Sequence, residues 1–466
     1  MKLSVLIIVC ALFFNIEVRC EKKPNVIFIV IDDMNDWISL LNSNSPIKTP
    51  NLERLAGKGM LFTNAYCPSP ACNPSRVSVL TGLRPSSSGV YGNNSDWRKA
   101  LPKRKTIFQK FMDHGYKVKG AGKIFHHKLN GAFHDKDSFD EFQHMSKQDH
   151  PKQKLNNAPE YGSIRTDWGR FPNNEKDSID YKTIDYCVEV IKENKSKNKK
   201  PLFLACGIYR PHSPFYAPQK FHEMVGNVEL PIRKKNDLDD LPFGARNLMK
   251  STRWFWNGMD KLDSKIPGSY QSFINSYAAC CVFADQQVGR LLDAVEENLP
   301  TNETIIILWS DHGFHLGEKN HIEKFMLWEK TTHVPFVFVA PGITKPGSKC
   351  SVPIDLTVLY PTILDVCSIE ADEPCDNVSI KKLLKGEANN WNRPAIMTYL
   401  KGNHAVRNNR WRYIRYSDGS EELYDHHEDK NEWNNVADVS KNAKIIKSMS
   451  QWLPAKEKEQ ISNLRR

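Results

Sequence analysis

The residues of this sequence that most directly suggest chemistry surround one cysteine, in the segment Cys72-Asn73-Pro74-Ser75-Arg76. Asn73 is a favourable N-cap and Pro74 a favourable first helical residue, so we expect a helix to begin immediately after Cys72. Its free N–H groups and positive dipole end would face the cysteine side chain, and the guanidinium of Arg76 suits an oxyanion. The pattern predicts an anion site beside a thiol of lowered pKa. The alternative is a short disulfide loop between Cys67 and Cys72.

Four residues elsewhere in the chain could hold a divalent metal ion. Asp32 and Asp33 are adjacent, and so are Asp311 and His312. Neighbouring carboxylates repel each other when both are ionised, and a bound cation removes that cost. Three carboxylates and one imidazole form a ligand set dominated by oxygen, which favours Ca²⁺ or Mg²⁺ over zinc. The alternative is that one of the aspartates caps a helix.

Buried strands are needed to bring these residues together. Five runs of apolar, β-branched residues predict such strands, at positions 25–31, 116–121, 202–208, 304–309 and 334–340. Segments with helical spacing separate them, most clearly at 276–298, where apolar residues recur on one face. Continuously apolar strands with helices between them indicate an α/β fold with a mostly parallel sheet that is covered by helices on both faces.

Polar residues follow the ends of four of these strands. The four sets are Asp32-Asp33, Lys123 with His126, Arg210 with His212, and Asp311-His312. Ligands of open α/β sheets bind at the carboxyl ends of the strands. One such set could belong to an ordinary solvated loop, but four together predict a single polar site at that edge of the sheet.

The chain divides by pattern into three parts. Residues 1–20 form the predicted signal peptide, 21–390 a large catalytic domain, and 391–466 a C-terminal subdomain. Short segments at 395–400, 404–407, 411–416 and 422–424 predict a small antiparallel sheet, followed by a terminal helix. The stretch 214–270 is rich in Pro, Lys and Trp and has no clean period, so we expect a long loop insertion there.

The first twenty residues predict export. Lys2 precedes an almost wholly apolar run from Leu3 to Phe14, and Cys20 suits a cleavage before Glu21. About a dozen residues are too few to cross a bilayer, which takes about 20, but they suit a secretory signal. We therefore expect an exported protein (secreted, periplasmic or lysosomal) without a stable membrane anchor. The alternative is a buried N-terminal strand.

Composition bounds the remaining function classes. The 466 residues are 40% hydrophobic and 26% charged, which excludes collagen-like, coiled-coil and wholly disordered chains. A net charge of +11 suits anionic partners such as sulfated glycans or phosphate esters. No block of Lys and Arg reaches the length that nucleic-acid binding needs, so we expect no nucleic-acid partner. Eleven cysteines are present, and nine remain after the predicted signal, so at least one is expected to be unpaired.

With these residues in view, the sequence resembles the type I sulfatases of the alkaline-phosphatase-like superfamily. The run Cys72-x-Pro74-x-Arg76, followed by Leu80-Thr81-Gly82, is similar to the signature that directs oxidation of the cysteine to Cα-formylglycine. The likeness extends from about residue 25 to 365, and more weakly through Glu422-Leu423-Tyr424-Asp425. The segments at 122–126 and 210–215 look most like the iduronate-2-sulfatase branch. The resemblance implies the superfamily's α/β fold, with a smaller C-terminal α+β subdomain that carries the antiparallel sheet.

The resemblance also implies a role for each candidate residue. It implies that Cys72 is converted to formylglycine by a formylglycine-generating or sulfatase-maturing enzyme. It implies one calcium ion per chain, held by Asp32, Asp33, Asp311 and His312, with residue 72 completing the shell. The implied catalytic residues are Arg76 on the formylglycine, Lys123 and Lys324 on the sulfate oxygens, His126 on the nucleophilic hydroxyl, and His212 near the leaving-group oxygen.

One segment departs from the family pattern. The family often continues Gly-Glu-His-Gly after the metal-binding strand, whereas this chain has Gly317-Glu318-Lys319-Asn320, with the spacing to Lys324 preserved. The departure puts the role of position 319 in doubt.

The function that the resemblance implies is hydrolysis of sulfate monoesters, on a sulfated saccharide that contains uronic acid. The three oxygens of a sulfate monoester repel a nucleophile, and a metal ion together with Arg76, Lys123 and Lys324 would neutralise that charge. A hydrated aldehyde carries two hydroxyls on one carbon, so that one can attack sulfur and deprotonation of the other can expel sulfate. Two alternatives stay open: a phosphonate or phosphodiester hydrolase of the same superfamily, and a catalytically silent glycan-binding protein.

Overall fold

The computed structural model describes residues 23–126, 134–145, 150–195, 200–388 and 391–462. The predicted signal peptide at 1–20 lies outside these residues. Within them, none of the helices combines the length and the apolar character that a membrane span requires.

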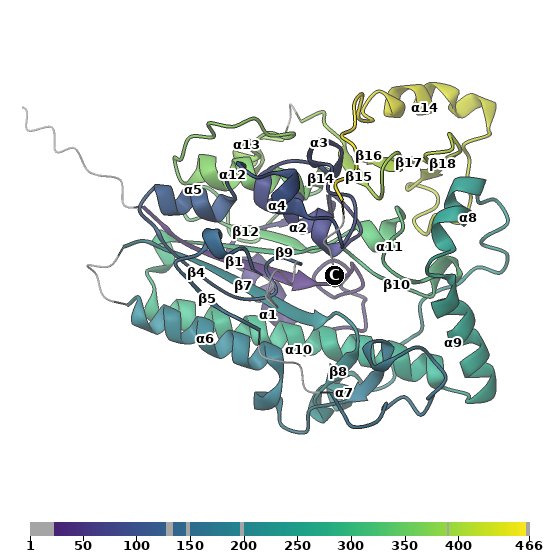
Figure 1. The fold of residues 1–466 in the computed structure, drawn as a ribbon, viewed down its shortest axis with the longest axis horizontal. Coiled ribbons are helices and arrows are strands. Elements are labelled where there is room, and N and C mark those ends of the chain that lie inside the picture. The colour runs from purple at the N-terminus through teal and green to yellow at the C-terminus, as the bar shows by residue number, and fades with distance from the viewer. Residues whose placement is uncertain (1–22, 127–133, 146–149, 196–199, 389–390, 463–466) are drawn as a thin grey trace, which may run out of the picture.

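An eight-stranded sheet runs through the main part of the molecule (Figure 1). Its spatial order is β13-β2-β12-β9-β1-β7-β4-β5. In chain order its strands are β1 (Asn25–Asp32), β2 (Met60–Phe62), β4 (Lys117–Gly122), β5 (Glu141–Gln143), β7 (Leu202–Pro211), β9 (Thr304–Ser310), β12 (Phe336–Val339) and β13 (Ser348–Cys350). Neighbours from β9 to β5 are parallel, whereas β12 is antiparallel to both β9 and β2. The sheet is therefore mostly parallel, which confirms the predicted fold class.

The central strand β1 shows why its sequence is apolar throughout. One core cluster contains Ile27, Ile29 and Ile31, and the cluster on the opposite face contains Val26, Phe28 and Val30. Successive side chains of a strand point to opposite faces, so a strand that is covered on both sides needs an apolar residue at every position. Polar residues begin where β1 ends, at Asp32.

Helices cover both faces of the sheet (Figure 1). One core cluster includes residues of α1 (Pro50–Lys58), α6 (Ile179–Glu193) and α10 (Ser269–Asn298), and the other includes residues of α2 (Cys72–Thr81), α5 (Ile107–Asp113) and α12 (Leu359–Val366). The connections carry α3 (Pro85–Ser88), α4 (Trp97–Ala100), α11 (Glu329–Thr332) and α13 (Lys381–Leu384). Short strand pairs join β3 (Ala65–Tyr66) to β14 (Ile354–Asp355), β6 (Trp168–Arg170) to β8 (Phe215–Ala217), and β10 (His315–Leu316) to β11 (Ile322–Glu323).

The stretch 214–270 is not the loop insertion that its composition suggests. After β8 it forms α7 (Gln219–Val225), α8 (Phe243–Met249) and α9 (Arg253–Lys265). Pro218 and Pro242 stand directly before helices, where a missing N–H breaks no helical hydrogen bond. In α9 the buried residues Trp256, Met259 and Leu262 recur at helical spacing. The prediction was wrong because three separate helices with different starts leave the stretch without one continuous period.

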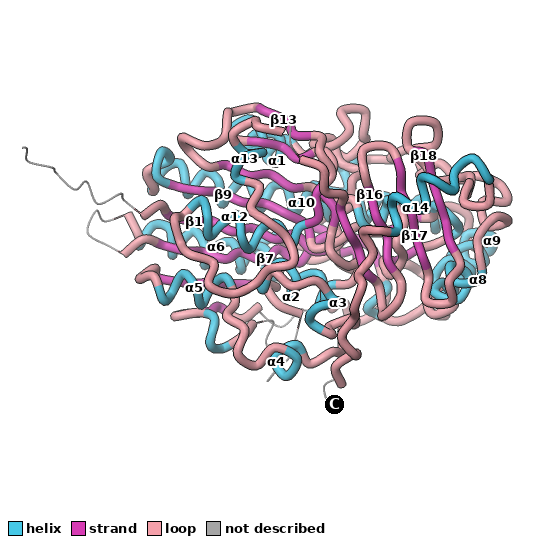
Figure 2. Tube along the Cα trace, turned by 90° about the horizontal axis from the view of Figure 1, so that it is seen from above, coloured by secondary structure: helices cyan, strands magenta, loops and turns pink. Residues whose placement is uncertain are grey.

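A four-stranded antiparallel sheet forms the C-terminal part of the chain and lies beside the main sheet (Figure 2). Its strands are β15 (Ala395–Thr398), β16 (His404–Arg407), β17 (Trp411–Arg415) and β18 (Glu421–Asp425), and α14 (Ala443–Ser450) follows them. Ala405 and Ile414 share a core cluster with Trp328, whereas Val406 and Tyr413 pack with Met449 of α14. The predicted antiparallel sheet and terminal helix are confirmed, and the boundary near residue 390 stays a prediction.

Residues 457–462, here called the C-terminal strap, lie against the segment that follows α3. The backbone N–H of Lys458 donates to the carbonyl of Ser86 at 2.8 Å, and that of Ile461 donates to Gly89 at 2.9 Å. Gly89 has φ +76°, and a Cβ there would come within 2.6 Å of the Glu459 carbonyl oxygen, so the close approach requires glycine. A few residues further along, Asn93 accepts a hydrogen bond from the backbone of α2. The strap therefore supports a segment that contacts the helix of Cys72.

Candidate active site

Helix α2 places Cys72 in its first turn. The helix begins at Cys72 with Ala71 as its N-cap, so the prediction that Asn73 is the N-cap is wrong. The side-chain amide of Asn73 donates instead to the carbonyls of Gly92 and Ser95, each at 3.0 Å, and its backbone N–H donates to Asn93 Oδ1 at 3.0 Å. These bonds join the start of α2 to the segment beneath the strap.

Cationic groups surround the Cys72 sulfur. The fully buried Sγ lies 3.2 Å from His312 Nε2, 3.4 Å from Lys324 Nζ and 3.7 Å from Lys123 Nζ. Burial by itself would raise the pKa of the thiol, but the neighbouring positive charges outweigh it and hold the pKa well below its usual value. Cys67 is a free thiol, and burial raises its pKa. The alternative of a Cys67–Cys72 disulfide is therefore wrong.

Arg76 follows Cys72 by one helical turn, which puts both side chains on the same face of α2. Its Nε is 2.8 Å from Asp311 Oδ2, and its Nη2 is 3.3 Å from Asp32 Oδ1. Its Nη1 donates to the backbone carbonyls of Lys123 and Ile124. One fully buried guanidinium thus joins the ends of β1, β4 and β9.

Two adjacent carboxylates at the end of β1 form the centre of a candidate metal site. Asp32, Asp33, Cys72 and His312 each offer one ligand atom, and these atoms all lie within 4.8 Å of one another. Asp33 Oδ2 is buried without a hydrogen-bond partner. Asp33 also has φ +63°, an uncommon conformation of the kind found at functional sites. An oxygen-preferring cation fits these residues, because it would supply the partner that Asp33 Oδ2 lacks.

Asp311, the remaining predicted ligand, lies beside this group. Its Oδ2 is 3.6 Å from His312 Nε2 and also contacts Arg76. Its Oδ1 accepts hydrogen bonds from the backbone N–H groups of Asp33, at 3.2 Å, and His312, at 3.0 Å. The structure therefore brings all the predicted ligands together, with Asp311 also serving as the partner of Arg76.

His312 has the orientation expected of a metal-binding histidine. Its Nδ1 lies 3.0 Å from the carbonyl of Gly313, which can only accept, so Nδ1 carries a proton. Its Nε2 therefore faces the sulfur and lies 3.4 Å from Asp33 Oδ1. Although burial opposes a charged imidazole, Asp311 and Cys72 raise the pKa of His312 to about 9. A position that favours a proton this strongly also favours a cation.

The two lysines predicted to bind sulfate come from different elements and meet at Cys72. Lys123 follows β4, and its ammonium pairs with Asp32. Lys324 follows β11, and its Nζ is 2.8 Å from Asp33 Oδ1. Burial opposes their charge, but the two aspartates outweigh it and raise the pKa of both lysines, which therefore stay protonated. Both positive charges are available to an anion at residue 72.

The two candidate histidines occupy different positions around Cys72. His126 is hydrogen-bonded to the Cys72 side chain, and burial lowers its pKa, so its imidazole is neutral near pH 7. His212 follows β7, and its Nδ1 contacts the carbonyl of Ser213 at 2.7 Å. Its Nε2 lies 4.0 Å from Asp33 Oδ2. The structure thus brings both histidines to the same cluster.

Two residues that the sequence did not single out also belong to the site. The ring of Tyr209 lies 5.3 Å from Lys123 Nζ and 4.8 Å from the ring of His212. Burial raises the pKa of Glu323, which interacts with Lys324 and Asp33. Tyr209 directly precedes the Arg210-Pro211-His212 segment, so its position at a polar strand end was the available signal.

Lys319, at the departure from the family pattern, belongs to another part of the molecule. Its ammonium is 3.3 Å from Asp237 Oδ1 and lies over the rings of Trp328, at 5.4 Å, and Tyr424, at 5.1 Å. These contacts join the loop to β18 of the C-terminal sheet. At the position where this chain departs from the family pattern, the lysine therefore packs against the C-terminal sheet.

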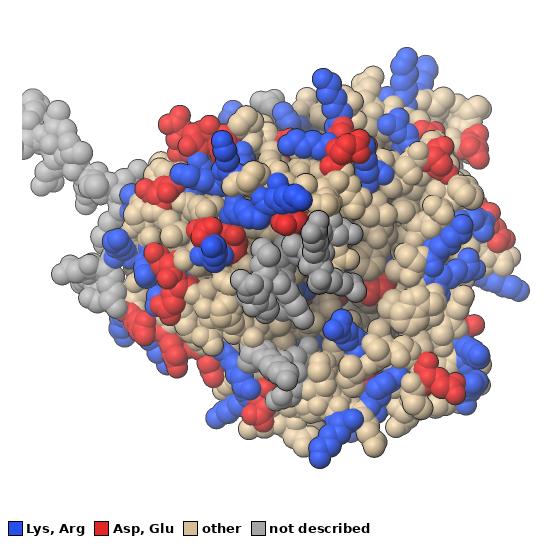
Figure 3. All heavy atoms as spheres, viewed as in Figure 1, with Lys and Arg blue, Asp and Glu red and all other residues tan. Residues whose placement is uncertain are grey.

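On the face seen in Figure 3, basic and acidic side chains are interspersed. Basic side chains do not gather into one large patch on that face. The dense positive charge around Cys72 comes instead from buried residues, which are screened less by salt.

Comparison with known proteins identifies sulfatases as relatives of this chain. Residues 24–369 match the sulfatase family, and residues 317–459 match the C-terminal region of N-sulphoglucosamine sulphohydrolase. A sulfatase of Formosa agariphila is 35% identical over 459 residues, which are 93% of this chain and 86% of the relative. Human iduronate 2-sulfatase is 27% identical over 460 residues, 91% of this chain and 82% of the relative.

Solved structures share the fold. A protein in complex with its substrate D-glucosamine-2-N,6-O-disulfate has a TM-score of 0.71 at 23% identity, over 93% of this chain and 97% of the other. The phosphonate monoester hydrolase of Agrobacterium radiobacter has a TM-score of 0.72 at 19% identity, over 92% and 94%. The sheet, with a polar cluster at its carboxyl edge, defines an alkaline-phosphatase-like protein. Within that class the chain belongs to the sulfatase family, close to its iduronate-2-sulfatase branch.

Proposed function

We propose that this protein hydrolyses sulfate monoesters of an anionic saccharide, with residue 72 as formylglycine at the centre of the site. The observation that carries the proposal is the position of the Cys72 sulfur, within 3.7 Å of nitrogens of Lys123, Lys324 and His312. In a matured protein an oxygen on the same carbon would take the place of that sulfur. These nitrogens would then surround the nucleophile and the sulfate group next to it.

The chain's own charged residues supply the electrostatic part of the mechanism. Lys123 and Lys324 oppose the charge of the sulfate oxygens, and Arg76 holds the hydrated aldehyde. Fixed charges in a site without water are usually the largest single contribution to catalysis. When residue 72 is the hydrated aldehyde, it supplies two hydroxyls, one to attack sulfur and one whose deprotonation releases sulfate. Asp32, Asp33, Asp311 and His312 would hold a calcium ion, which supplies further positive charge.

The two histidines would move the protons. Neutral His126 is hydrogen-bonded to residue 72 and can accept a proton from the nucleophilic hydroxyl. In His212 the proton sits on Nδ1, because that nitrogen contacts a carbonyl. Its Nε2 is therefore the nitrogen that, once protonated, can serve the leaving-group oxygen. His212→Ala should slow a sugar sulfate more than an aryl sulfate, since a sugar alkoxide needs proton donation far more than a phenolate does.

Matched esters test the reaction class. The likeness in fold to a phosphonate monoester hydrolase favours one competing function, hydrolysis of phosphonate monoesters or of phosphate diesters. We expect kcat/KM for 4-nitrophenyl sulfate to exceed that for 4-nitrophenyl phenylphosphonate, which has the same leaving group, by at least about tenfold, or 1.4 kcal/mol in the transition state. A preference for the phosphonate ester would transfer the assignment to the competing class.

Conversion of Cys72 is tested by mass spectrometry of the peptide that contains it. Protein made together with a formylglycine-generating or sulfatase-maturing enzyme should carry an aldehyde in place of the thiol. Fully active protein whose residue 72 is only thiol would exclude the proposed mechanism. The full burial of Cys72 implies that this partner acts before the chain has folded.

A sulfated, uronic-acid-containing saccharide is the substrate class that we propose. Human iduronate 2-sulfatase is a relative, and the solved neighbour above has a sulfated glucosamine as its substrate. The net charge of +11 favours encounter with polyanions, and salt weakens such attraction over about 8 Å at physiological ionic strength. KM for a sulfated oligosaccharide should therefore rise with salt, while KM for a small aryl sulfate changes little. If choline sulfate or aryl sulfates outperform every saccharide, the substrate class is wrong.

We also propose that the protein is exported, with residues 1–20 removed. The sequence pattern at these residues supports the proposal. N-terminal sequencing of protein recovered outside the producing cells should begin at Glu21. Recovery only inside the cells, with residue 1 retained, would contradict it.

A further inference from the structure

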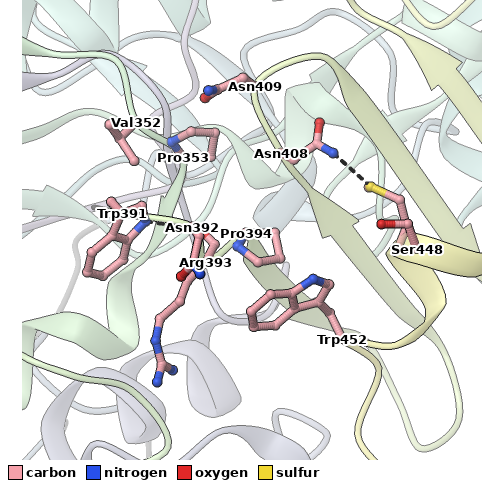
Figure 4. A pocket seen from close by; sticks show the side chains of 11 residues that line it. Val352, Pro353, Trp391, Asn392, Arg393, Pro394, Asn408, Asn409, Ser448 and Trp452 are labelled. Atoms are coloured by element: carbon pink, nitrogen blue, oxygen red, sulfur yellow. Dashed lines mark hydrogen bonds between the residues drawn. The ribbon is translucent and has the colours of Figure 1, made fainter. Parts of the chain in front are cut away.

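A pocket outside the Cys72 site lies beside the C-terminal sheet (Figure 4). It has a volume of about 240 Å³ and is formed by the segment before β15, the turn between β16 and β17, and the end of α14. The residues that carry its chemistry are Trp391, Arg393, Asn409, Ser448 and Trp452. None of these residues belongs to the cluster around Cys72.

Two indoles give the pocket flat apolar surfaces. In Figure 4 the rings of Trp391 and Trp452 lie on either side of Arg393 and Pro394. The Trp391 Nε1 donates to the carbonyl of Arg393 at 2.9 Å, which fixes that indole. Trp452 is 37% exposed, so its indole is accessible. Indoles that are fixed yet accessible suit the apolar face of a ring-shaped ligand.

Arg393 gives the pocket an unpaired positive charge. Its side chain is exposed, and among the described residues no carboxylate pairs with it. The residues that line the pocket include no Asp or Glu. Arg410, in the neighbouring turn, is by contrast paired with Asp425 at 2.6 Å. A guanidinium in a hollow without acids is suited to a sulfate or a carboxylate of a ligand.

Uncharged polar groups complete the pocket. Within the described part of the chain, no side-chain hydrogen bond occupies Asn409 or the hydroxyl of Ser448. The amide of Asn408 is different, because its Nδ2 contacts Met449 Sδ at 3.0 Å and its Oδ1 accepts from two backbone N–H groups. Open amide and hydroxyl groups can both donate to and accept from the hydroxyls of a sugar.

We propose that this pocket is a second saccharide subsite, which binds a sulfated or uronic-acid sugar of a polymeric substrate at a distance from the Cys72 site. Stacking surfaces, one free guanidinium and open amide groups together match an anionic sugar. A proline-rich peptide could also use the indoles, but it would leave the guanidinium without an anion. As a binding site the pocket stands by itself, whereas its part in catalysis rests on the proposed function.

The position of β15 shows how the two sites are related. The strand begins directly after Arg393-Pro394 at the pocket and ends at Thr398, whose N–H donates to the carbonyl of Pro68 at 2.9 Å. Pro68 stands four residues before Cys72. β15 spans roughly 13 Å, and the Cys72 site lies beyond its far end, so we expect only a saccharide of several sugar units to contact both sites. Binding at the pocket would then raise the local concentration of the chain at the catalytic site.

A binding experiment tests the pocket without catalysis. Cys72→Ala protein is titrated calorimetrically with a heparin dodecasaccharide, with the same oligosaccharide after desulfation, and with a proline-rich peptide. We expect Trp452→Ala and Arg393→Gln, each added to the Cys72→Ala background, to weaken binding of the heparin probe about tenfold, or 1.4 kcal/mol. Trp254→Ala and Arg253→Gln on α9 are the matched controls, because Trp254 is an exposed indole, 46%, that follows an exposed arginine.

A kinetic experiment tests the relation to catalysis. In the matured enzyme the two pocket substitutions should raise KM for long sulfated oligosaccharides by about tenfold, with kcat and all constants for 4-nitrophenyl sulfate unchanged. Equal losses in the α9 controls, unchanged binding in both pocket variants, or binding of the peptide in preference to heparin would each overturn the subsite. If heparin binds at the pocket but no sulfate ester is hydrolysed, the proposed function fails while the binding site stands.

Discussion

Two buried clusters of acids and histidines differ in how completely their charges are partnered. In the catalytic cluster, lysine and arginine side chains pair with the aspartates, but Asp33 Oδ2 accepts no hydrogen bond. In the second cluster, Glu329, His426 and Glu432 are also close enough to hold a metal ion. There, however, Arg412 pairs with Glu329 and lies with its Nε 2.6 Å from Glu432 Oε1. A guanidinium of the chain itself supplies the positive charge that an ion would bring.

This difference distinguishes an ion-pair network that stabilises the fold from a site that can bind a ligand. Burying a polar atom is costly unless it is hydrogen-bonded, so a network in which every carboxylate oxygen has a partner needs no ligand, whereas Asp33 Oδ2 has room for one. Arg412 also donates to the backbone carbonyl of Leu327 at 2.8 Å, three residues after Lys324. The Arg412 network of the C-terminal sheet thereby fixes the segment that places Lys324 in the catalytic cluster. Similar residue types therefore have different roles in the two clusters.

The largest expected effect separates the clusters by activity. Cys72→Ala in otherwise matured enzyme should reduce kcat/KM for 4-nitrophenyl sulfate by at least about 10⁴-fold, because the nucleophile is lost. Its thermal unfolding should stay close to that of the wild type, measured by circular dichroism. Cys67→Ala, at another buried thiol nearby, is the control and should keep most of the activity. A Cys72→Ala variant with substantial turnover would contradict the catalytic role of the cluster.

The next effect concerns stability and belongs to the second cluster. Arg412→Ala removes the guanidinium that Glu329 and Glu432 share, and should lower the free energy of unfolding by about 3 kcal/mol. Urea denaturation measures the change. Arg410→Ala, which breaks an exposed pair with Asp425, is the control and should have a much smaller effect. Equal effects of the two substitutions would show that the Arg412 network is not a structural element.

The third effect, of intermediate size, is the stabilisation of the folded protein by calcium. After dialysis against a chelator, Ca²⁺ at about 100 times its dissociation constant should stabilise the protein by about 2.7 kcal/mol. Asp33→Asn should abolish the gain, whereas Glu432→Gln should retain it, because the second cluster is already neutralised by Arg412. Differential scanning calorimetry with and without Ca²⁺ measures both. If only Glu432→Gln loses the calcium stabilisation, the ion binds at the second cluster and not at the catalytic one.

The smallest effect is the pH dependence of the second cluster. Burial opposes ionisation of Glu432, but Arg412 outweighs it and holds the pKa below its usual value of 4.5. The unfolded chain therefore binds the proton more readily, so this stabilisation is complete above pH 4.5 and is lost as the pH falls through the folded-state pKa. The stability difference between wild type and Glu432→Gln should shrink on acidification, by up to about 1.4 kcal/mol per pH unit.

Urea denaturation at several pH values from about 6 to 3.5 measures that slope. Glu229→Gln, which removes a carboxylate at an exposed position, is measured alongside as the control for the loss of one acidic group. A constant difference for Glu432→Gln would mean that Arg412 does not stabilise the ionised carboxylate.

Much of the fold was predictable because the buried strands are apolar at every position. The same feature located the site, since Asp32, Lys123, His212 and Asp311 each mark the point where an apolar strand stops. Lys324 was different: it follows a two-residue strand in an irregular segment, and only the family resemblance indicated it. No local pattern could indicate where its side chain lies, because its partner Asp33 is 291 positions away.

The errors have local causes as well. The helices at 219–225 and 243–249 were missed because the prolines directly before them resemble the prolines of loops, and the helix at 253–265, which begins after Thr252, was missed with them. Helix α2 starts earlier than its sequence indicates because the Asn73 side chain is engaged by Gly92 and Ser95 in a distant segment. Glu323 and Tyr209 have their roles through tertiary neighbours, which composition and spacing do not encode.

The C-terminal strap is synthesised last, so the contacts that it makes form after the rest of the chain has been made. Cys72 is closed off by a helix whose first turn is bound to Asn93, and the segment leading to Asn93 is held by residues 457–462. A ribosome completes the helix long before it makes the strap. Throughout that interval the segment that contacts the Cys72 helix lacks the support of the strap, and under the proposed function an enzyme that modified the thiol would have its opportunity then. The order of synthesis thus sets how long the cysteine is open to modification.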